Sequence, residues 1–126
     1  MRLADQILAL HSEIHEVSII EERVGHYAIV DEASRKGVTF LADITHSERT
    51  QGLLAPMILL GAATQFGGRE SRLIGIEYEN AALVIAPLTD KKLVLLSTRL
   101  ESAPDVMRTI SQTPLTKLEQ FPEQTP

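Results

Sequence analysis

Apolar residues recur at intervals of four and three along the first part of the chain, a spacing typical of an amphipathic helix. The positions are Leu3, Ile7, Leu10, Ile14 and Val17. We expect this helix to reach about Glu22, with Gly25 as its C-terminal stop. The segment "EVSIIEE" (16–22) is also compatible with a strand, so the pattern leaves the boundary between the first helix and the first strand open.

The next segments predict a hairpin and then a helix. We expect Tyr27–Asp31 and Val38–Ala42 to be strands, with Ser34–Gly37 turning between them. The apolar stretch "GLLAPMILLGAATQFGG" (52–68) is long enough for a helix that ends near Phe66 at two glycines. Small residues in the middle of this stretch predict that another backbone comes close to it.

Three strands joined by tight turns follow. "RLIGIEYE" (72–79) alternates between apolar and polar residues, which indicates a half-exposed or edge strand. "ALVIAPL" (82–88) and "KLVLLST" (92–98) are almost entirely apolar, which indicates strands buried on both faces. After Leu100 a last helix is expected, with Pro104 in its first turn.

The predicted order is therefore helix, two strands, helix, three strands, helix. A chain of 126 residues favours one domain, which we place at 1–111. The segment 112–126 is rich in Pro, Thr and Gln and is expected to be a flexible tail. An open alternative is that its apolar residues dock on the domain. These residues are Leu115, Leu118 and Phe121.

Composition narrows the classes of function. The net charge is −5, with 12 basic and 17 acidic residues, whereas nucleic-acid binders usually carry a basic excess. No cysteine is present, which rules out disulfides and thiolate metal sites and suits a reducing cytoplasm. No apolar run approaches the ~20 residues of a membrane span, and the N-terminus does not resemble a signal peptide. We expect a cytoplasmic protein without nucleic-acid partners.

Two stretches and the order of elements resemble the roadblock family of dynein light chains, in its bacterial and archaeal branch. "AIVDEASRKGVTFLA" is similar to the first hairpin of that family. "IEYENAALVIAPLTDKKLVLLS" is similar to its last three strands, including the "APL" of Ala86-Pro87-Leu88. The likeness spans roughly residues 2–111. The long first helix and Pro56 in the second depart from the family pattern.

The resemblance implies an α+β fold, a five-stranded antiparallel sheet sandwiched between helices in the order α-β-β-α-β-β-β-α. The first and last helices would cover one face and the second helix the other. It also implies a dimer, either of identical chains or with a related chain, in which the 72–79 strands pair across a twofold axis. A bare strand edge needs such a partner, and so does a second helix apolar on more than one side.

A dimer or partner interface is accordingly expected on the second helix and the edge strand. Its candidate residues are Leu53, Leu54, Met57, Ile58, Gly61, Ala62, Gln65, Leu73, Ile74, Gly75, Ile76, Glu77 and Tyr78.

Reactive chemistry is weakly indicated. His11 and His15 have the i, i+4 spacing of zinc ligands on a helix, but two histidines at the border of an amphipathic helix are usually solvated. Asp31 and Glu32 are neighbours on a strand and would point to opposite faces. No G-x-S-x-G elbow is present. We therefore expect no catalytic residues, no cofactor and no metal, and a metal-binding enzyme is the least favoured reading.

The resemblance instead implies a non-catalytic interaction module that binds a small Ras-like GTPase and regulates or scaffolds it. The alternative within the family is a structural adaptor of a motor or cargo complex that does not respond to nucleotide.

Overall fold

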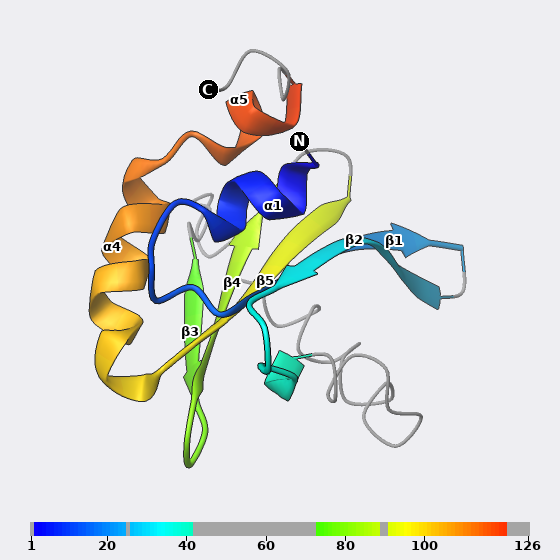
Figure 1. The fold of residues 1–126 in the computed structure, drawn as a ribbon. Coiled ribbons are helices and arrows are strands. Elements are labelled where there is room, and N and C mark those ends of the chain that lie inside the picture. The colour runs from blue at the N-terminus through cyan, green and yellow to red at the C-terminus, as the bar shows by residue number, and fades with distance from the viewer. Residues whose placement is uncertain (1, 25, 42–72, 89–90, 121–126) are drawn as a thin grey trace, which may run out of the picture.

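The computed structural model describes residues 2–24, 26–41, 73–88 and 91–120. They form one five-stranded sheet in the order β2-β1-β5-β4-β3, in which every neighbouring pair is antiparallel (Figure 1). The elements along the chain are α1 (Leu3–Leu8), β1 (Glu16–Arg23), β2 (His26–Ser34), β3 (Ile74–Glu77), β4 (Ala82–Pro87), β5 (Lys92–Thr98), the 3-10 helix η1 (Leu100–Ser102), α4 (Ala103–Gln112) and α5 (Leu115–Gln120). The predicted five-stranded antiparallel α+β fold is confirmed.

The first helix is shorter than predicted. It ends at Leu8, and residues 16–23 form β1, which lies between β2 and β5. The expected continuation of the helix to Glu22 is therefore wrong, and the strand alternative holds. The physical reason is burial on both faces of the sheet: Val17 and Ile19 pack on the α1 side while Ile20 packs on the opposite side. A helical stripe would have buried only one side of this segment.

The first hairpin also differs from the prediction. β2 pairs with β1 over its whole length, from Glu16 opposite Ser34 to Arg23 opposite His26. The predicted partner strand Val38–Ala42 is not a strand in its described part, because Phe40 and Leu41 have helical backbone. The predicted turn is confirmed within residues 35–38, where Val38 N donates to Arg35 O (3.2 Å).

The last three strands and the last helix are where the sequence predicts them. β4 is buried from Ala82 to Ala86, and β5 from Val94 to Thr98. η1 and then α4 follow, with Pro104 in the first turn of α4, where a missing N–H costs no hydrogen bond.

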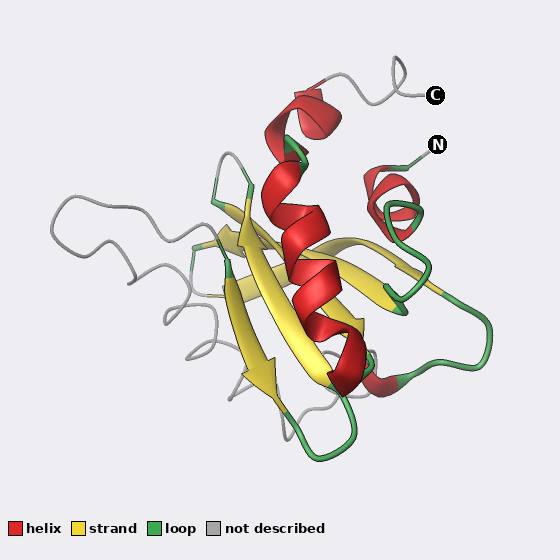
Figure 2. Ribbon diagram, turned by 90° about the vertical axis from the view of Figure 1, so that its left-hand side faces the viewer, coloured by secondary structure: helices red, strands yellow, loops and turns green. Residues whose placement is uncertain are grey.

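Among the described elements, α1, α4 and α5 cover one face of the sheet (Figure 2). This confirms the expectation for the first and last helices, and the second predicted helix lies outside the described residues. The core on this face, which we call the helix-side core, contains Ala4, Ile7, Ile14, Val17, Ile19, Val84, Ala86, Val94, Leu96, Val106, Ile110, Leu115 and Leu118. The core on the opposite face contains Ile20, Leu41, Leu83, Ile85 and Leu95.

Part of the expected tail is a helix. Leu115 and Leu118 of α5 are 6% and 9% exposed and belong to the helix-side core, as in the docking alternative. Lys92 Nζ lies 3.5 Å from Glu119 Oε2 and so links α5 to the sheet. Phe121 lies outside the described residues. Within the described residues, no helix is long and apolar enough to cross a membrane.

Candidate interaction edge

The candidate interface residues fall into two groups. Those from Leu53 to Gln65 lie outside the described residues. Positions 73–78 belong to β3 and its ends, and β3 is an edge strand whose only described neighbour is β4. The edge character that the alternating sequence predicts is therefore present.

The hydrogen-bond pattern shows which backbone groups of β3 face outward. Tyr78 N donates to Ala81 O (2.8 Å), and this pair continues the register in which Ile76 lies opposite Leu83. In an antiparallel ladder, residues that bond to the neighbouring strand alternate with residues whose N–H and C=O point the other way. Tyr78 and Ile76 therefore turn their backbone groups to β4, and Gly75 and Glu77 turn theirs to the open edge.

The side chains of this strand divide between the two faces. Ile76 and Tyr78 pack against the core opposite the helices, where the Tyr78 ring meets the Phe40 ring edge-on at 5.4 Å. Leu73 packs against the helix-side core. Gly75 and Glu77 are exposed. The exposed residues of β3 are thus Gly75 and Glu77, and the side chains of Leu73, Ile76 and Tyr78 pack into the apolar layers on the two faces of the sheet.

Gly75 lies under a side chain of α4. A Cβ atom placed on Gly75 would lie 3.0 Å from Met107 Sδ and 3.2 Å from its Cε. Met107 is only partly buried. The thioether therefore lies on the backbone of the edge strand, and any strand added beside β3 would come next to it.

The other edge of the sheet is built differently. The register of β2 against β1 shifts between Ile19 and Ile20, which leaves Val30 as an extra, bulged residue that is 39% exposed. Next to it, Asp31 accepts a hydrogen bond from Ala4 N (3.0 Å) and pairs with Arg2 (3.3 Å), both at the start of the chain. Bulges and charges are the usual protection of an edge strand against pairing. β3 has a regular register and is the more suitable edge for a partner.

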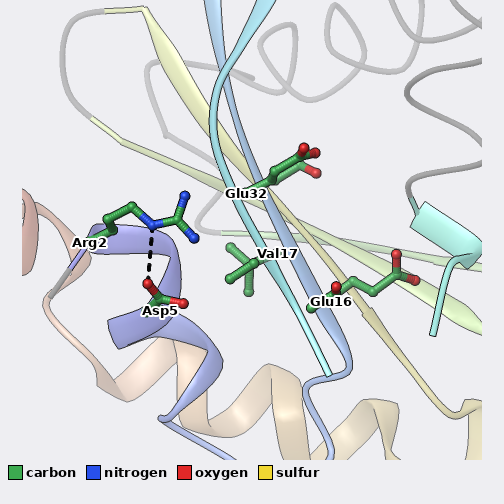
Figure 3. A pocket seen from close by; sticks show the side chains of 8 residues that line it. Arg2, Asp5, Glu16, Val17 and Glu32 are labelled. Atoms are coloured by element: carbon green, nitrogen blue, oxygen red, sulfur yellow. Dashed lines mark hydrogen bonds and ion pairs between the residues drawn. The ribbon is translucent and has the colours of Figure 1, made fainter. Parts of the chain in front are cut away.

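A hollow of about 360 Å³ lies beside the protected edge (Figure 3). Val17 points toward α1, whereas Glu16 and Glu32 point to the other side of the sheet. Asp31 is bonded on the α1 side, so Asp31 and Glu32 point to opposite faces as predicted. Arg2, the cation of the hollow, is already engaged by Asp5 and Asp31. The residues that line the hollow are Arg2, Asp5, Glu16, Val17, Ser18, Glu32, Ala33 and Ser34.

Glu16 is a buried acid that the sequence reading did not single out. It is 2% exposed, and its Oε1 accepts hydrogen bonds from Leu41 N (2.7 Å) and Ser97 Oγ (3.1 Å). The carboxylate thus bonds to the first residues of the helical segment beyond β2 and ties them to β1 and β5. The signal in the sequence is an acid directly before an apolar, β-branched run.

The two histidines do not share a helix face. Both lie in the connection between α1 and β1, where His11 Nδ1 accepts from Glu13 N (2.9 Å) and His15 Nε2 lies 3.3 Å from Glu13 Oε2. The helical spacing that suggested zinc ligands is therefore wrong. Among the described residues, no group of three His, Asp or Glu side chains is arranged to hold a metal ion.

Arg35 fixes this connection to the end of β2. Its guanidinium donates to three carbonyl oxygens, those of Ile14 (2.8 Å), Leu8 (3.0 Å) and His11 (3.1 Å). Arginine suits this role because its fork presents several N–H groups at fixed angles. The role is structural, and sequence spacing offers no sign of it.

Comparison with solved structures identifies the fold, whereas comparison of sequences does not. No protein-family model matches the sequence, and no curated protein sequence matches it. Among solved structures, a Roadblock/LC7 domain from Streptomyces avermitilis superposes with a TM-score of 0.62 at 12% identity, covering 97% of this chain and 96% of that one. MglB from Myxococcus xanthus superposes with a TM-score of 0.54 at 16% identity, covering 94% and 92% of the two chains. The resemblance inferred from the sequence is thereby confirmed at the level of architecture: the chain has the roadblock fold.

Proposed function

We propose that this protein is a non-catalytic, dimeric interaction module of the cytoplasm that binds a small Ras-like GTPase and regulates or scaffolds it. The observation that carries the proposal is the regular strand β3 on a roadblock fold, which among the described residues has a neighbouring strand on one side only. An edge strand of this kind is stabilised by pairing with another strand.

Pairing between two copies satisfies this need with one surface. A twofold axis brings the same patch of both chains together, so that each edge covers the other. The bulged and charged β2 edge stays available to solvent in such a dimer, because it lies at the far side of the sheet. This arrangement supports β3 and not β2 as the dimer edge.

The GTPase is proposed from the likeness to the roadblock family. In the described part of the chain, Asp31, His11 and His15 are engaged in structural contacts. Any effect on GTP hydrolysis would then come from ordering the residues of the GTPase itself. The segment Leu53–Gln65 stays our predicted contact surface for the GTPase.

The test has two stages. The first measures the mass of the purified chain by native mass spectrometry, for which we expect twice 13.9 kDa. The matched variants are Glu77→Pro, which removes an outward N–H, and Glu77→Ala, which keeps it. We expect Glu77→Pro to be monomeric and folded, and Glu77→Ala to remain dimeric. Equal masses for the two variants would contradict pairing through β3.

The second stage measures binding to each purified Ras-like GTPase of the source organism by calorimetry. Each GTPase is loaded with GDP or with a non-hydrolysable GTP analogue. We expect at least one to bind with a Kd that differs about tenfold or more between the two states. Equal affinity in both states would favour the adaptor alternative, and no binding would overturn the proposed function.

A further inference from the structure

The edge strand β2 is protected along only part of its length. The bulge and the ion pair beside it lie in the middle of the strand, whereas the register from Glu32 to Ser34 is regular. Arg35, directly after β2, donates its N–H to His15 O (2.9 Å) and so turns toward β1. This direction alternates along an antiparallel strand, so the N–H and C=O groups of Glu32 and Ser34 point to the outer edge. This short piece of β2 has the geometry to pair with one more strand.

The hollow beside this piece follows the strand edge and is not confined to one face of the sheet (Figure 3). Val17 and Ala33 line it on the α1 side, whereas Glu32 and Ser18 belong to the opposite side. A strand laid along this edge would send alternate side chains into the two parts of the hollow. Its volume of about 360 Å³ falls in the range of about 300–1,000 Å³ that is common for ligand sites.

Ser18 sets a requirement for whatever fills the hollow. It is 2% exposed, lies opposite Glu32 on the neighbouring strand and lines the hollow. Its hydroxyl forms no hydrogen bond with another residue in the described part of the chain. A ligand that excludes water from this place must therefore supply a hydrogen-bonding group, since a buried hydroxyl without a partner is costly. A lysine ammonium offers three donors for this purpose.

The charges along the edge favour a basic occupant. The described residues that line the two hollows along β2 carry four carboxylates and a single guanidinium, that of Arg2, which already pairs with two of them. Arg35 turns its guanidinium to the α1–β1 connection. A second copy paired through β2 would bring like charges together across the new strand pair, which is destabilising, whereas a lysine opposite Glu32 would form an attractive pair. The four carboxylates are those of Asp5, Glu16, Asp31 and Glu32.

We propose that β2 accepts an extended basic segment of a partner protein as an additional antiparallel strand, paired with Glu32–Ser34. Two residues of the segment, two positions apart, exchange backbone hydrogen bonds with Glu32 and Ser34 and send basic side chains to the side of Ser18. The residue between them points to Val17 and Ala33, where an apolar side chain fits. The proposal does not depend on the dimer or the GTPase, because β3 lies at the other end of the sheet.

The probe is a short peptide built to this pattern, acetyl-Val-Lys-Val-Lys-Val-amide, titrated into the isotope-labelled full chain and followed by NMR. The matched control is the same peptide with glutamate in place of lysine. We expect the amide signals of Glu32 and Ser34 to shift. We also expect the lysine peptide to bind at least about tenfold more tightly than the glutamate peptide, by a margin that shrinks in high salt. Equal binding of the two peptides would overturn the charge preference.

Methylation of the peptide backbone tests the strand pairing. In the proposed register the N–H groups of both lysines face β2, and that of the central valine faces solvent. N-methylation of both lysines should weaken binding about tenfold or more, and N-methylation of the central valine should change the Kd by less than about threefold. Equal losses for the two modified peptides would overturn pairing through the backbone.

The matched change in the protein is Glu32→Lys at the exposed rim of the hollow. It should reverse the preference, so that the glutamate peptide binds more tightly than the lysine peptide. An unchanged preference would overturn the register. Shifts confined to β3, or no saturable binding of the lysine peptide, would overturn the site. Slow hydrogen exchange of the Ser34 amide without peptide would show that the chain itself or a second copy covers the edge, and would overturn the external partner.

Discussion

Arg99 donates two hydrogen bonds to the carboxylate of Glu13, from Nε to Oε2 (3.0 Å) and from Nη2 to Oε1 (2.9 Å). The hydrogen bond from Arg99 is the largest cause of a pKa of Glu13 below its ordinary value, and His15 adds to the effect. The pair joins the α1–β1 connection to the residue that follows β5.

The sign of the resulting pH dependence follows from that pKa. A carboxyl group with a lowered pKa in the folded state stabilises the protein above its unfolded pKa, and the contribution is lost as the pH falls through the folded pKa. We expect Glu13→Gln to lower the urea midpoint at pH 7, and this difference to shrink as the pH falls through the lowered pKa of Glu13. Asp105→Asn is the control, because the exposed Asp105–Arg108 pair at 3.4 Å should change the midpoint at neither pH.

Replacement of Arg35 should destabilise the fold through the loss of three hydrogen bonds to carbonyl oxygens. We expect Arg35→Ala to reduce the free energy of unfolding by about 1–2 kcal/mol, since each net hydrogen bond contributes on the order of 1 kcal/mol and the site is open to water. Arg35→Lys should recover less than half of this, because an ammonium group lacks the planar fork. Denaturant unfolding measures both, with Lys36→Ala as the control for the loss of a neighbouring charge, and full recovery by Arg35→Lys would contradict the role of the fork.

Neighbouring hydroxyls on β5 should respond in opposite directions. Thr98 Oγ1 is buried, and it has no hydrogen-bond partner in the described part of the chain, so Thr98→Val should leave the stability unchanged or raise it by up to about 1 kcal/mol. Ser97 Oγ donates to Glu16, and Ser97→Ala should cost about 1–2 kcal/mol by removing a donor from a buried carboxylate. Thermal unfolding of the two variants side by side tests this contrast. Destabilisation by Thr98→Val would indicate a hydrogen bond that this structure lacks.

The β4–β5 turn contains a strained lysine. Lys91 has a φ of +62°, a conformation that favours glycine. We expect Lys91→Gly to stabilise the protein by about 0.5–1 kcal/mol and Lys91→Ala to do nothing comparable, because alanine keeps the Cβ atom that causes the strain. Equal effects of the two changes would attribute the gain to the lost charge instead.

The strands that the sequence predicts well are those whose pattern fits a single structure. β3 alternates at an edge, and β4 and β5 are continuous apolar runs between turn residues, so no helix competes with them. The pattern leaves β1 undecided because Val17 continues the helical spacing from Ile14 and also lies two positions from Ile19, the period of a strand. Only the tertiary structure decides between the two, by placing Val17 under α1 and Ile20 on the opposite face.

Side-chain contacts were predicted less completely than strands, because they depend on residues distant in the sequence. The acceptor role of Glu16 requires Leu41 and Ser97 to meet it, at separations of 25 and 81 residues. The backbone groups of Gly75 and Glu77 face away from β4 because of the register of the β3–β4 hairpin. A pattern of apolar residues does not specify that register.

The position of β5 has a consequence for how the chain folds. The last strand in the sequence lies at the centre of the sheet, between the first strand and the fourth. The two hairpins, β1–β2 and β3–β4, have no contact through the sheet until β5 is inserted between them. During synthesis the β1–β2 hairpin cannot pair with β5 until residue 98 has been added. Its apolar residues stay exposed until then, and this exposure favours association with chaperones. Pulse-labelling hydrogen exchange should show the amides of all five strands becoming protected in one step, whereas early protection of β1–β2 alone would contradict this order.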